Sequence, residues 1–171
     1  MLKVKPFRQK TGYCGPASLK MVLDYYGVEK SEKDLAELTD CTMEVGVEGE
    51  KLVEVAKRLG LAGQIKDDAS LDDIRHFVLE KQVPVIVDWF DEDDGHYSVV
   101  VDIDDTHIYF VDPSIGMVRT MPLEKFWRVW FDFPGEYIRT KDDLTIRRMM
   151  IIYKEGVRRE IVKRPEDVAE W

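Results

Sequence analysis

The first half of the chain spaces its apolar residues as helices do. Pro16 stands in what would be a first helical turn, and the apolar positions that follow stop at Gly27. Ser31 and Ser70 each precede an aspartate by three residues, a pattern typical of a helix start, and Gly60 ends a further amphipathic run. The pattern predicts helices over about 18–26, 31–38 and 49–59, and from residue 70 onward.

From Val83 onward, the pattern changes to short β-branched and apolar runs separated by turn residues. These runs predict strands over 83–89, 97–103, 106–111, 117–120 and 146–153, after an earlier brief strand over 62–66. A helix is predicted over 123–130, and Gly156 could turn the last strand into a final hairpin. Helices first and sheet second indicate an α+β fold. We expect one domain over residues 1–171, with a helical part at about 14–80 and a sheet part at about 83–155.

Composition narrows the class of protein. The 171 residues are 44% hydrophobic, enough for a sizeable core, and the net charge is −9 with Lys and Arg scattered among carboxylates. Nucleic acid is therefore not expected as a partner. No signal peptide and no apolar run of about 18 residues is evident, so no membrane segment and a cytoplasmic location are expected. In that reducing compartment, Cys14 and Cys41 are expected to be free thiols. The sequence does not indicate an oligomeric state.

Cys14 is the strongest candidate for chemistry. The small residues and the proline after it predict that it lies at the N-terminus of a helix, where free N–H groups and the helix dipole favour negative charge. In such a setting, with an imidazolium nearby, a thiol pKa of about 8.5 can fall to roughly 3.5–7.5. We therefore interpret Cys14 as a nucleophile.

His96 and Asp112 are predicted to meet across a hairpin. If the two strands pair through an odd-numbered turn centred on Asp104, His96 lies directly opposite Asp112, close enough for the carboxylate to bind the imidazole. An even two-residue turn would place the two side chains on opposite faces. The odd register also places Ser98 and Phe110, with Val100 and Ile108, on the same face as a packed layer beneath the site.

These residues can then be given roles. Cys14 would attack a carbonyl carbon, His96 would transfer the proton, and Asp112 would orient the imidazole. The side chain of Gln9 and the backbone N–H of Cys14 would donate to the oxyanion, where loss of one donor typically costs roughly 2.7–4 kcal/mol in barrier height.

A family resemblance rests on the same residues. Gln9, the segment from Cys14 to Gly27 that begins Cys-Gly-Pro-Ala-Ser, Gly95-His96-Tyr97, the segment Asp112-Pro113-Ser114-Ile115-Gly116 and Phe126-Trp127 resemble the bacteriocin-processing cysteine peptidases of the papain-like clan. The resemblance covers the chain from Gln9 to about Trp130. It implies a papain-like fold, a catalytic set of Cys14, His96, Asp112 and Gln9, and a peptide or protein substrate, with no cofactor and no metal.

The sequence departs from the leader-cleaving members of that family. Tyr13 stands where they usually have an acidic residue, the spacing from Gln9 to Cys14 is one residue shorter, and no transporter part is expected in this chain. The standalone relatives are therefore the closer match. A peptidase or amide hydrolase that uses a cysteine thioester is the leading hypothesis; the alternatives are an acyltransferase with the same site and a catalytically silent peptide-binding module.

The remaining polar residues carry no site prediction. Cys41 is interpreted as a buried or loop thiol, His76 as a residue on a helix flank, and His107 as a residue on the opposite face of the hairpin from the site. The acidic run 91–94 lacks the spaced oxygen ligands of a calcium loop and is expected to be solvated. The aromatic residues Trp89, Phe90, Trp127, Trp130 and Phe131 could form core or line a peptide cleft.

Overall fold

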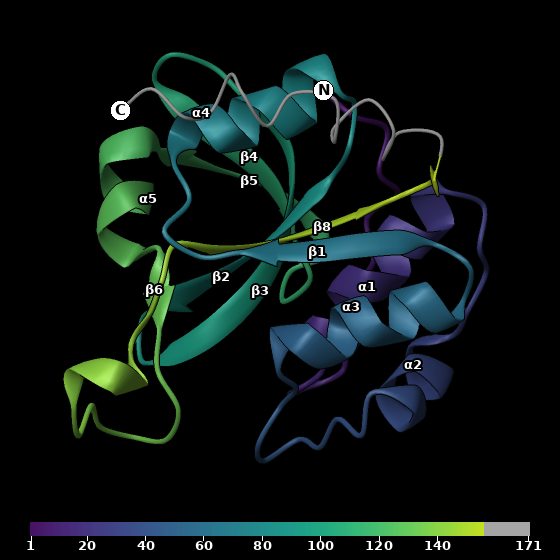
Figure 1. Ribbon diagram of the computed structural model, residues 1–171, viewed down its shortest axis with the longest axis horizontal. Helices are drawn as coiled ribbons and strands as arrows, with labels where there is room; N and C mark the ends of the chain where they lie inside the picture. The colour runs from purple at the N-terminus through teal and green to yellow at the C-terminus, as the bar shows by residue number, and fades with distance from the viewer. Residues whose placement is uncertain (156–171) are drawn as a thin grey trace.

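The centre of the protein is one antiparallel sheet. The structure, a computed structural model, describes residues 1–155, and Figure 1 shows its helices arranged around this sheet. The strand order is β1-β8-β2-β3-β4-β5, and every neighbouring pair is antiparallel. The strands are β1 Ala62–Lys66, β2 Val85–Asp91, β3 Asp94–Ile103, β4 His107–Asp112, β5 Met117–Pro122 and β8 Arg148–Tyr153. A small second sheet pairs β6 Phe131–Asp132 with β7 Thr145–Ile146.

The helices form two groups. Figure 1 shows α1, α2 and α3 together on one side, with α4 and α5 on the other. The helices are α1 Cys14–Tyr25, α2 Glu32–Leu38, α3 Gly49–Arg58, α4 Leu71–Arg75 and α5 Leu123–Val129, with a π-helical turn His76–Glu80 after α4 and a 3-10 turn Lys141–Asp143. Within the described residues, no helix is both long enough and apolar enough to cross a membrane.

The predicted α+β class is confirmed, with one difference in its layout. Strand β1 lies within the predicted helical part of the sequence, yet it pairs with β8 from the far end of the described chain. Strand β2 begins at Val85 because Pro84 has no N–H to donate to a ladder, whereas the N–H of Val83 closes the preceding helical turn on Phe77. The single domain over 1–171 stays a prediction, and the hairpin at Gly156 lies outside the described residues.

The register of the β3–β4 hairpin differs from the predicted one. Ile103 pairs with Ile108 across an even, four-residue connection, whereas Val99 pairs with Val111, so the register shifts by one residue at Val101. An even turn alone would place His96 and Asp112 on opposite faces of the sheet. The extra residue of this β-bulge brings them back to the same face. Continuing the register past Val99 places Ser98 opposite Asp112. The prediction of direct pairing was therefore wrong, but His96, two residues along the strand, still shares a face with Asp112.

Large apolar side chains hold these strands in place. Trp89 and Phe110 are buried on the same face as Ser98, with their ring centroids 5.4 Å apart, and the Trp89 Nε1 donates to the Ser98 hydroxyl at 3.0 Å. This packing fixes the part of β2, β3 and β4 from which the polar side chains near Cys14 extend.

Candidate active site

Cys14 is the first residue of α1, as the sequence predicts. The preceding residue, Tyr13, forms no side-chain cap, and no acidic side chain stands in the first turn. The first N–H groups of the helix are therefore not occupied by a capping side chain or neutralised by a nearby carboxylate. The Cys14 side chain is half-buried, whereas Cys41 is buried, and both are free thiols.

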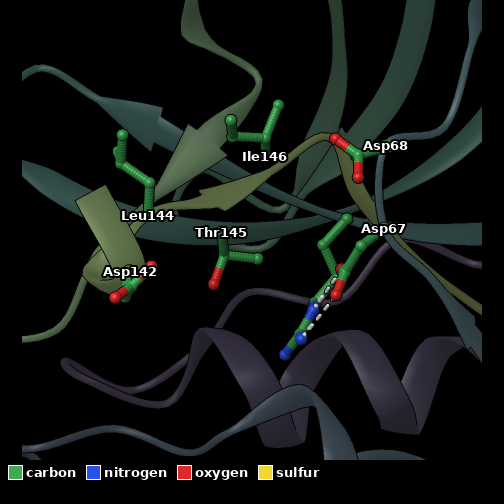
Figure 2. A pocket seen from close by; sticks show the side chains of 7 residues that line it. Asp67, Asp68, Asp142, Leu144, Thr145 and Ile146 are labelled. Carbon is green, nitrogen blue, oxygen red and sulfur yellow. Dashed lines mark hydrogen bonds and ion pairs between the residues drawn. The ribbon is translucent and has the colours of Figure 1, made fainter.

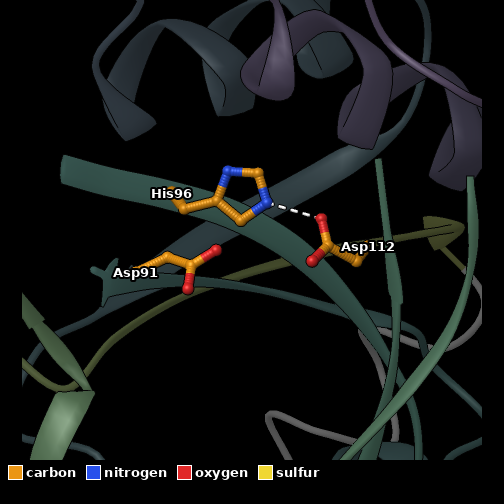
Figure 3. Close-up of side chains that lie close together, drawn as sticks. All are labelled: Asp91, His96 and Asp112. Atoms are coloured by element: carbon orange, nitrogen blue, oxygen red, sulfur yellow. Dashed lines mark hydrogen bonds and ion pairs between the residues drawn. The ribbon is translucent and has the colours of Figure 1, made fainter. Parts of the chain in front are cut away.

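His96 and Asp112 form a short hydrogen bond. The distance from His96 Nε2 to Asp112 Oδ1 is 2.6 Å, and the Asp112 side chain is fully buried. Figure 3 shows the two side chains facing each other from β3 and β4. The Ser114 N–H and hydroxyl also donate to Oδ1, at 2.9 and 2.7 Å. The turn after β4 thus fixes the carboxylate that holds the imidazole.

The electrostatics of this pair favour an imidazolium beside a carboxylate. Burial lowers the pKa of His96, but hydrogen bonds to Asp112 and Cys14, together with the charges of both groups, outweigh it and raise the pKa to about 10. Burial likewise raises the pKa of Asp112, but its bonds to His96 and Ser114 outweigh that effect and hold the pKa well below its usual range. The structure thus brings Cys14, His96 and Asp112 into one interacting group.

Gln9 lies against the turn that follows Asp112. Its backbone N–H donates to the Pro113 carbonyl at 2.8 Å, and its side-chain Nε2 donates to the Lys10 carbonyl at 3.2 Å. Its Oε1 is buried and has no hydrogen-bond partner within the part of the chain that the structure describes. The N-terminal segment is therefore tied to the site, and the role of Gln9 as an oxyanion donor stays a prediction.

Arg119 is a residue of this region that sequence reasoning missed. Its guanidinium donates to Asp112 Oδ2 at 2.9 Å and to Asp91 Oδ2 at 3.3 Å, and it lies 5.3 Å from the centroid of the Trp89 ring. The alternation of side chains along β5 is the sequence signal that could have indicated it. Arg119 pairs with Phe110, which lies two residues from Asp112 on β4, so Arg119 and Asp112 share a face of the sheet.

The same contacts bear on metal binding. Ligand-type atoms of Asp91, His96 and Asp112 lie within 4.8 Å of one another, a spacing that could hold a metal ion (Figure 3). Arg119 already bonds both carboxylates and supplies a positive charge there. We therefore assign Asp91, His96, Asp112 and Arg119 to an ion-pair network. The prediction that the whole acidic run 91–94 is solvated was wrong for Asp91, which belongs to this network. Glu92, Asp93 and Asp94 are exposed, as expected.

A second missed feature is a pair of neighbouring carboxyl groups, buried Asp88 on β2 and half-buried Asp132 on β6. Burial, followed by the charge of Asp132, raises the pKa of Asp88 well above its usual range, and Cys14 adds to the effect. Burial also raises the pKa of Asp132. Both shifts favour the protonated form, because two negative charges so close together and largely out of water would repel each other. Sequence reasoning could not pair them because they meet only through packing of β6 on β2.

The remaining predictions have plain outcomes. His76 is bonded to Glu80, and His107 points to the other face of β4, so neither joins the site. Trp89 and Trp130 are core residues, whereas Trp127 is half-exposed under Arg147. A hollow of about 350 Å³ is lined by Asp67 and Arg148, among others, and by none of the predicted site residues. Figure 2 shows the side chains of Asp67, Asp68 and Thr145 around it.

Helices packed on an antiparallel sheet, with a cysteine at the start of the first helix, define the papain-like class of cysteine peptidase folds. The chain belongs to the Peptidase C39 family, whose model matches residues 4–133. Both the predicted fold and the family resemblance are thereby confirmed.

Individual relatives agree with this assignment. The chain is 35% identical over 116 residues to an uncharacterized protein of Methanothermobacter marburgensis, a match that covers 66% of this chain and 73% of that protein. It is also 35% identical over 120 residues to the transport/processing ATP-binding protein ComA of Streptococcus pneumoniae, which covers 68% of this chain but only 16% of ComA. This chain therefore corresponds to a small part of that transporter.

Solved structures show the same fold. The peptidase domain of Streptococcus ComA, a bifunctional ABC transporter of a quorum-sensing pathway, matches with a TM-score of 0.69 and 24% identity, covering 89% of this chain and 99% of that domain. A double-glycine-motif protease of an AMS/PCAT transporter, in complex with a leader peptide, matches with a TM-score of 0.61 and 20% identity, covering 86% of this chain and 89% of that one.

Proposed function

We propose that this protein is a cysteine peptidase in which Cys14, His96 and Asp112 hydrolyse a peptide bond. The observation that carries the proposal is the hydrogen-bonded His96–Asp112 pair beside a cysteine at a helix N-terminus. Peptides are the substrate class because the related ComA is a processing protein and a related protease is bound to a leader peptide.

The proposed reaction has two steps. The Cys14 sulfur attacks the carbonyl carbon, and the proton on His96 passes to the nitrogen of the leaving amine as the C–N bond breaks, which leaves a thioester. A water molecule then attacks the thioester carbonyl, His96 accepts the proton of that water, and the sulfur leaves as the acid product forms. Asp112 keeps the imidazole oriented in both steps, and the backbone N–H of Cys14 with the Gln9 side chain would stabilise each oxyanion.

Alkylation by iodoacetamide tests the nucleophile without knowledge of the substrate. We expect Cys14 to be alkylated at pH 6 because the His96 imidazolium stabilises its thiolate, and the His96→Ala variant to react at least tenfold more slowly there. Cys41 serves as an internal control, because burial, the charge of Cys14 and that of Glu32 raise its pKa to about 11. Peptide mapping by mass spectrometry separates the two cysteines, and His107→Ala is the matched control variant.

The outcome decides between the three candidate functions: peptidase, acyltransferase and peptide-binding module. Equal alkylation of Cys14 in the wild type and in His96→Ala would contradict the proposal and favour a peptide-binding module. If Cys14 is reactive, a peptide library digested by the wild type and by Cys14→Ala should show cleavage in the wild type alone. Transfer of the acyl group to an added amine, with no free acid formed, would instead indicate an acyltransferase.

A further inference from the structure

We propose that Arg119 is a positioning residue of the Cys14–His96–Asp112 site. It would hold one oxygen of the Asp112 carboxylate so that the other oxygen faces His96. The inference rests on the proposed function, because a positioning residue has meaning only if the His96–Asp112 pair serves Cys14. Arg119 would not touch the substrate and would act only through Asp112.

The two oxygens of Asp112 have different surroundings. Oδ1 accepts from His96 and from both the N–H and the hydroxyl of Ser114, whereas Oδ2 accepts from Arg119. The Asp112 side chain is fully buried, so a lost donor cannot be replaced by bulk water at no cost. With both ends of the carboxylate bonded, its plane is fixed, and that plane sets the direction of the bond to His96.

Arg119 is itself held in place from two directions. Asp91 accepts from the same guanidinium nitrogen that bonds Asp112, and the guanidinium stacks over the Trp89 ring. Trp89 is buried, bonded to Ser98, and packed edge-on against His96 with ring centroids 5.6 Å apart. One indole therefore contacts both the imidazole and the guanidinium, so that Arg119, Asp112 and His96 are fixed as a unit.

The charges that face His96 dictate how the test must be built. They are Cys14 from α1, Asp112 from β4, Asp91 from β2 and Arg119 from β5. Removing Arg119 alone would delete a positive charge near the imidazole and raise the pKa of His96 by electrostatics. The double variant Arg119→Met/Asp91→Asn deletes one charge of each sign, so the local net charge is unchanged and the lost bond to Oδ2 is the main effect.

The experiment is an NMR titration of the histidine ring protons. The chain has only three histidines, so His76 and His107 are internal controls in the same spectrum. We expect the pKa of His96, about 10 in the wild type, to fall by about one pH unit in the double variant while the two controls stay unchanged. A purely structural role for Arg119 would lower stability without moving the pKa of His96 in the folded protein.

Control variants separate this inference from the proposed function. Lys20→Met/Asp24→Asn removes another half-buried ion pair and should leave His96 unchanged. Asp112→Asn tests the pair itself: an unchanged pKa of His96 in that variant would contradict the proposed function. A fall in Asp112→Asn with no fall in the Arg119 double variant would overturn only the role of Arg119. If the methionine variant does not fold, Arg119→Gln/Asp91→Asn is measured instead, with the same direction expected.

Discussion

Single residues near the candidate site carry unusual protonation, and Asp88 is the clearest case. Its side chain is 5% exposed, and its Oδ1 has no hydrogen-bond partner among the described residues. Asp132 is anchored by the Phe133 N–H at 2.8 Å. A negative charge on Asp88 would face both Asp132 and a Cys14 thiolate, so the raised pKa of Asp88 would lower repulsion beside the proposed nucleophile.

Asp88→Asn is predicted to stabilise the protein as the pH rises. A raised folded pKa means that the stabilising contribution of the protonated acid is present at low pH and is lost as the pH rises through that value. Asparagine cannot ionise, so the free energy of unfolding of the variant should exceed that of the wild type by about 1–3 kcal/mol at pH 9. Urea denaturation from pH 4 to pH 9 measures the difference.

The control for this prediction is Asp93→Asn, which removes an exposed carboxylate close by in sequence. It should change the unfolding free energy by less than about 0.5 kcal/mol at every pH. A pH dependence of Asp88→Asn identical to that of the wild type would show that Asp88 titrates as an ordinary surface acid does.

At the scale of elements, the start of α4 joins a helix to the sheet. The Ser70 hydroxyl accepts from the Asp73 N–H at 3.1 Å, and Asp73 accepts from the Ser70 N–H at 2.8 Å, which is a complete capping box. The other oxygen of Asp73 binds Lys66 of β1 at 2.7 Å. One carboxylate thus serves both the helix cap and an ion pair to the sheet.

Ser70→Ala should lower the free energy of unfolding by about 1 kcal/mol, because it removes the cap of a short helix. Asp73→Ala should cost more, since it also removes the bond to Lys66. Urea denaturation measures both, and Ser31→Ala on α2, where the cap lacks the reciprocal bond, is the matched control. Equal losses in Ser70→Ala and Asp73→Ala would mean that the link to β1 contributes nothing.

Elements differ in how far the sequence predicts them. Capping serines and helix-ending glycines are local signals, so the starts and ends of α2 and α3 were predicted to within a residue or so, and β1 was predicted in full. The bulge at Val101 has no such signal, because nothing in that run of valines marks which residue is left unpaired. The His96–Asp112 contact was therefore predicted, but through the wrong register.

Site residues that depend on contacts between distant strands could not be predicted from local patterns. Cys14 and His96 belong to short motifs, whereas Arg119 reaches Asp112 and Asp91 only once the four strands β2 to β5 are aligned. Asp132 lies close to Asp88 although β3, β4, β5 and α5 separate them in the sequence. Residues such as Arg119 and Asp132 can therefore be assigned to the site region only when the pairing of the strands is known.

At the scale of the whole molecule, the pH dependence of stability should report the His96–Asp112 pair. His96 has a pKa raised from 6.5 to about 10, so its contribution is fully present below pH 6.5 and is lost as the pH rises to about 10. Asp112 has a lowered pKa, so its contribution is present above about pH 3.8 and is lost as the pH falls toward the lower folded value. The pair alone therefore keeps the free energy of unfolding constant between about pH 3.8 and pH 6.5.

The prediction is a fall in unfolding free energy of up to about 1.4 kcal/mol per pH unit on the alkaline side of that range. Because Asp88 and, above about pH 9, Cys41 would contribute falls in the same direction, the measurement belongs in the Asp88→Asn background, by urea denaturation from pH 5 to pH 9. Adding His96→Ala should flatten the alkaline slope, whereas adding His107→Ala should not. A slope that survives in the His96→Ala variant would have to come from another group, and the buried imidazolium–carboxylate pair would then not govern the alkaline stability of the fold.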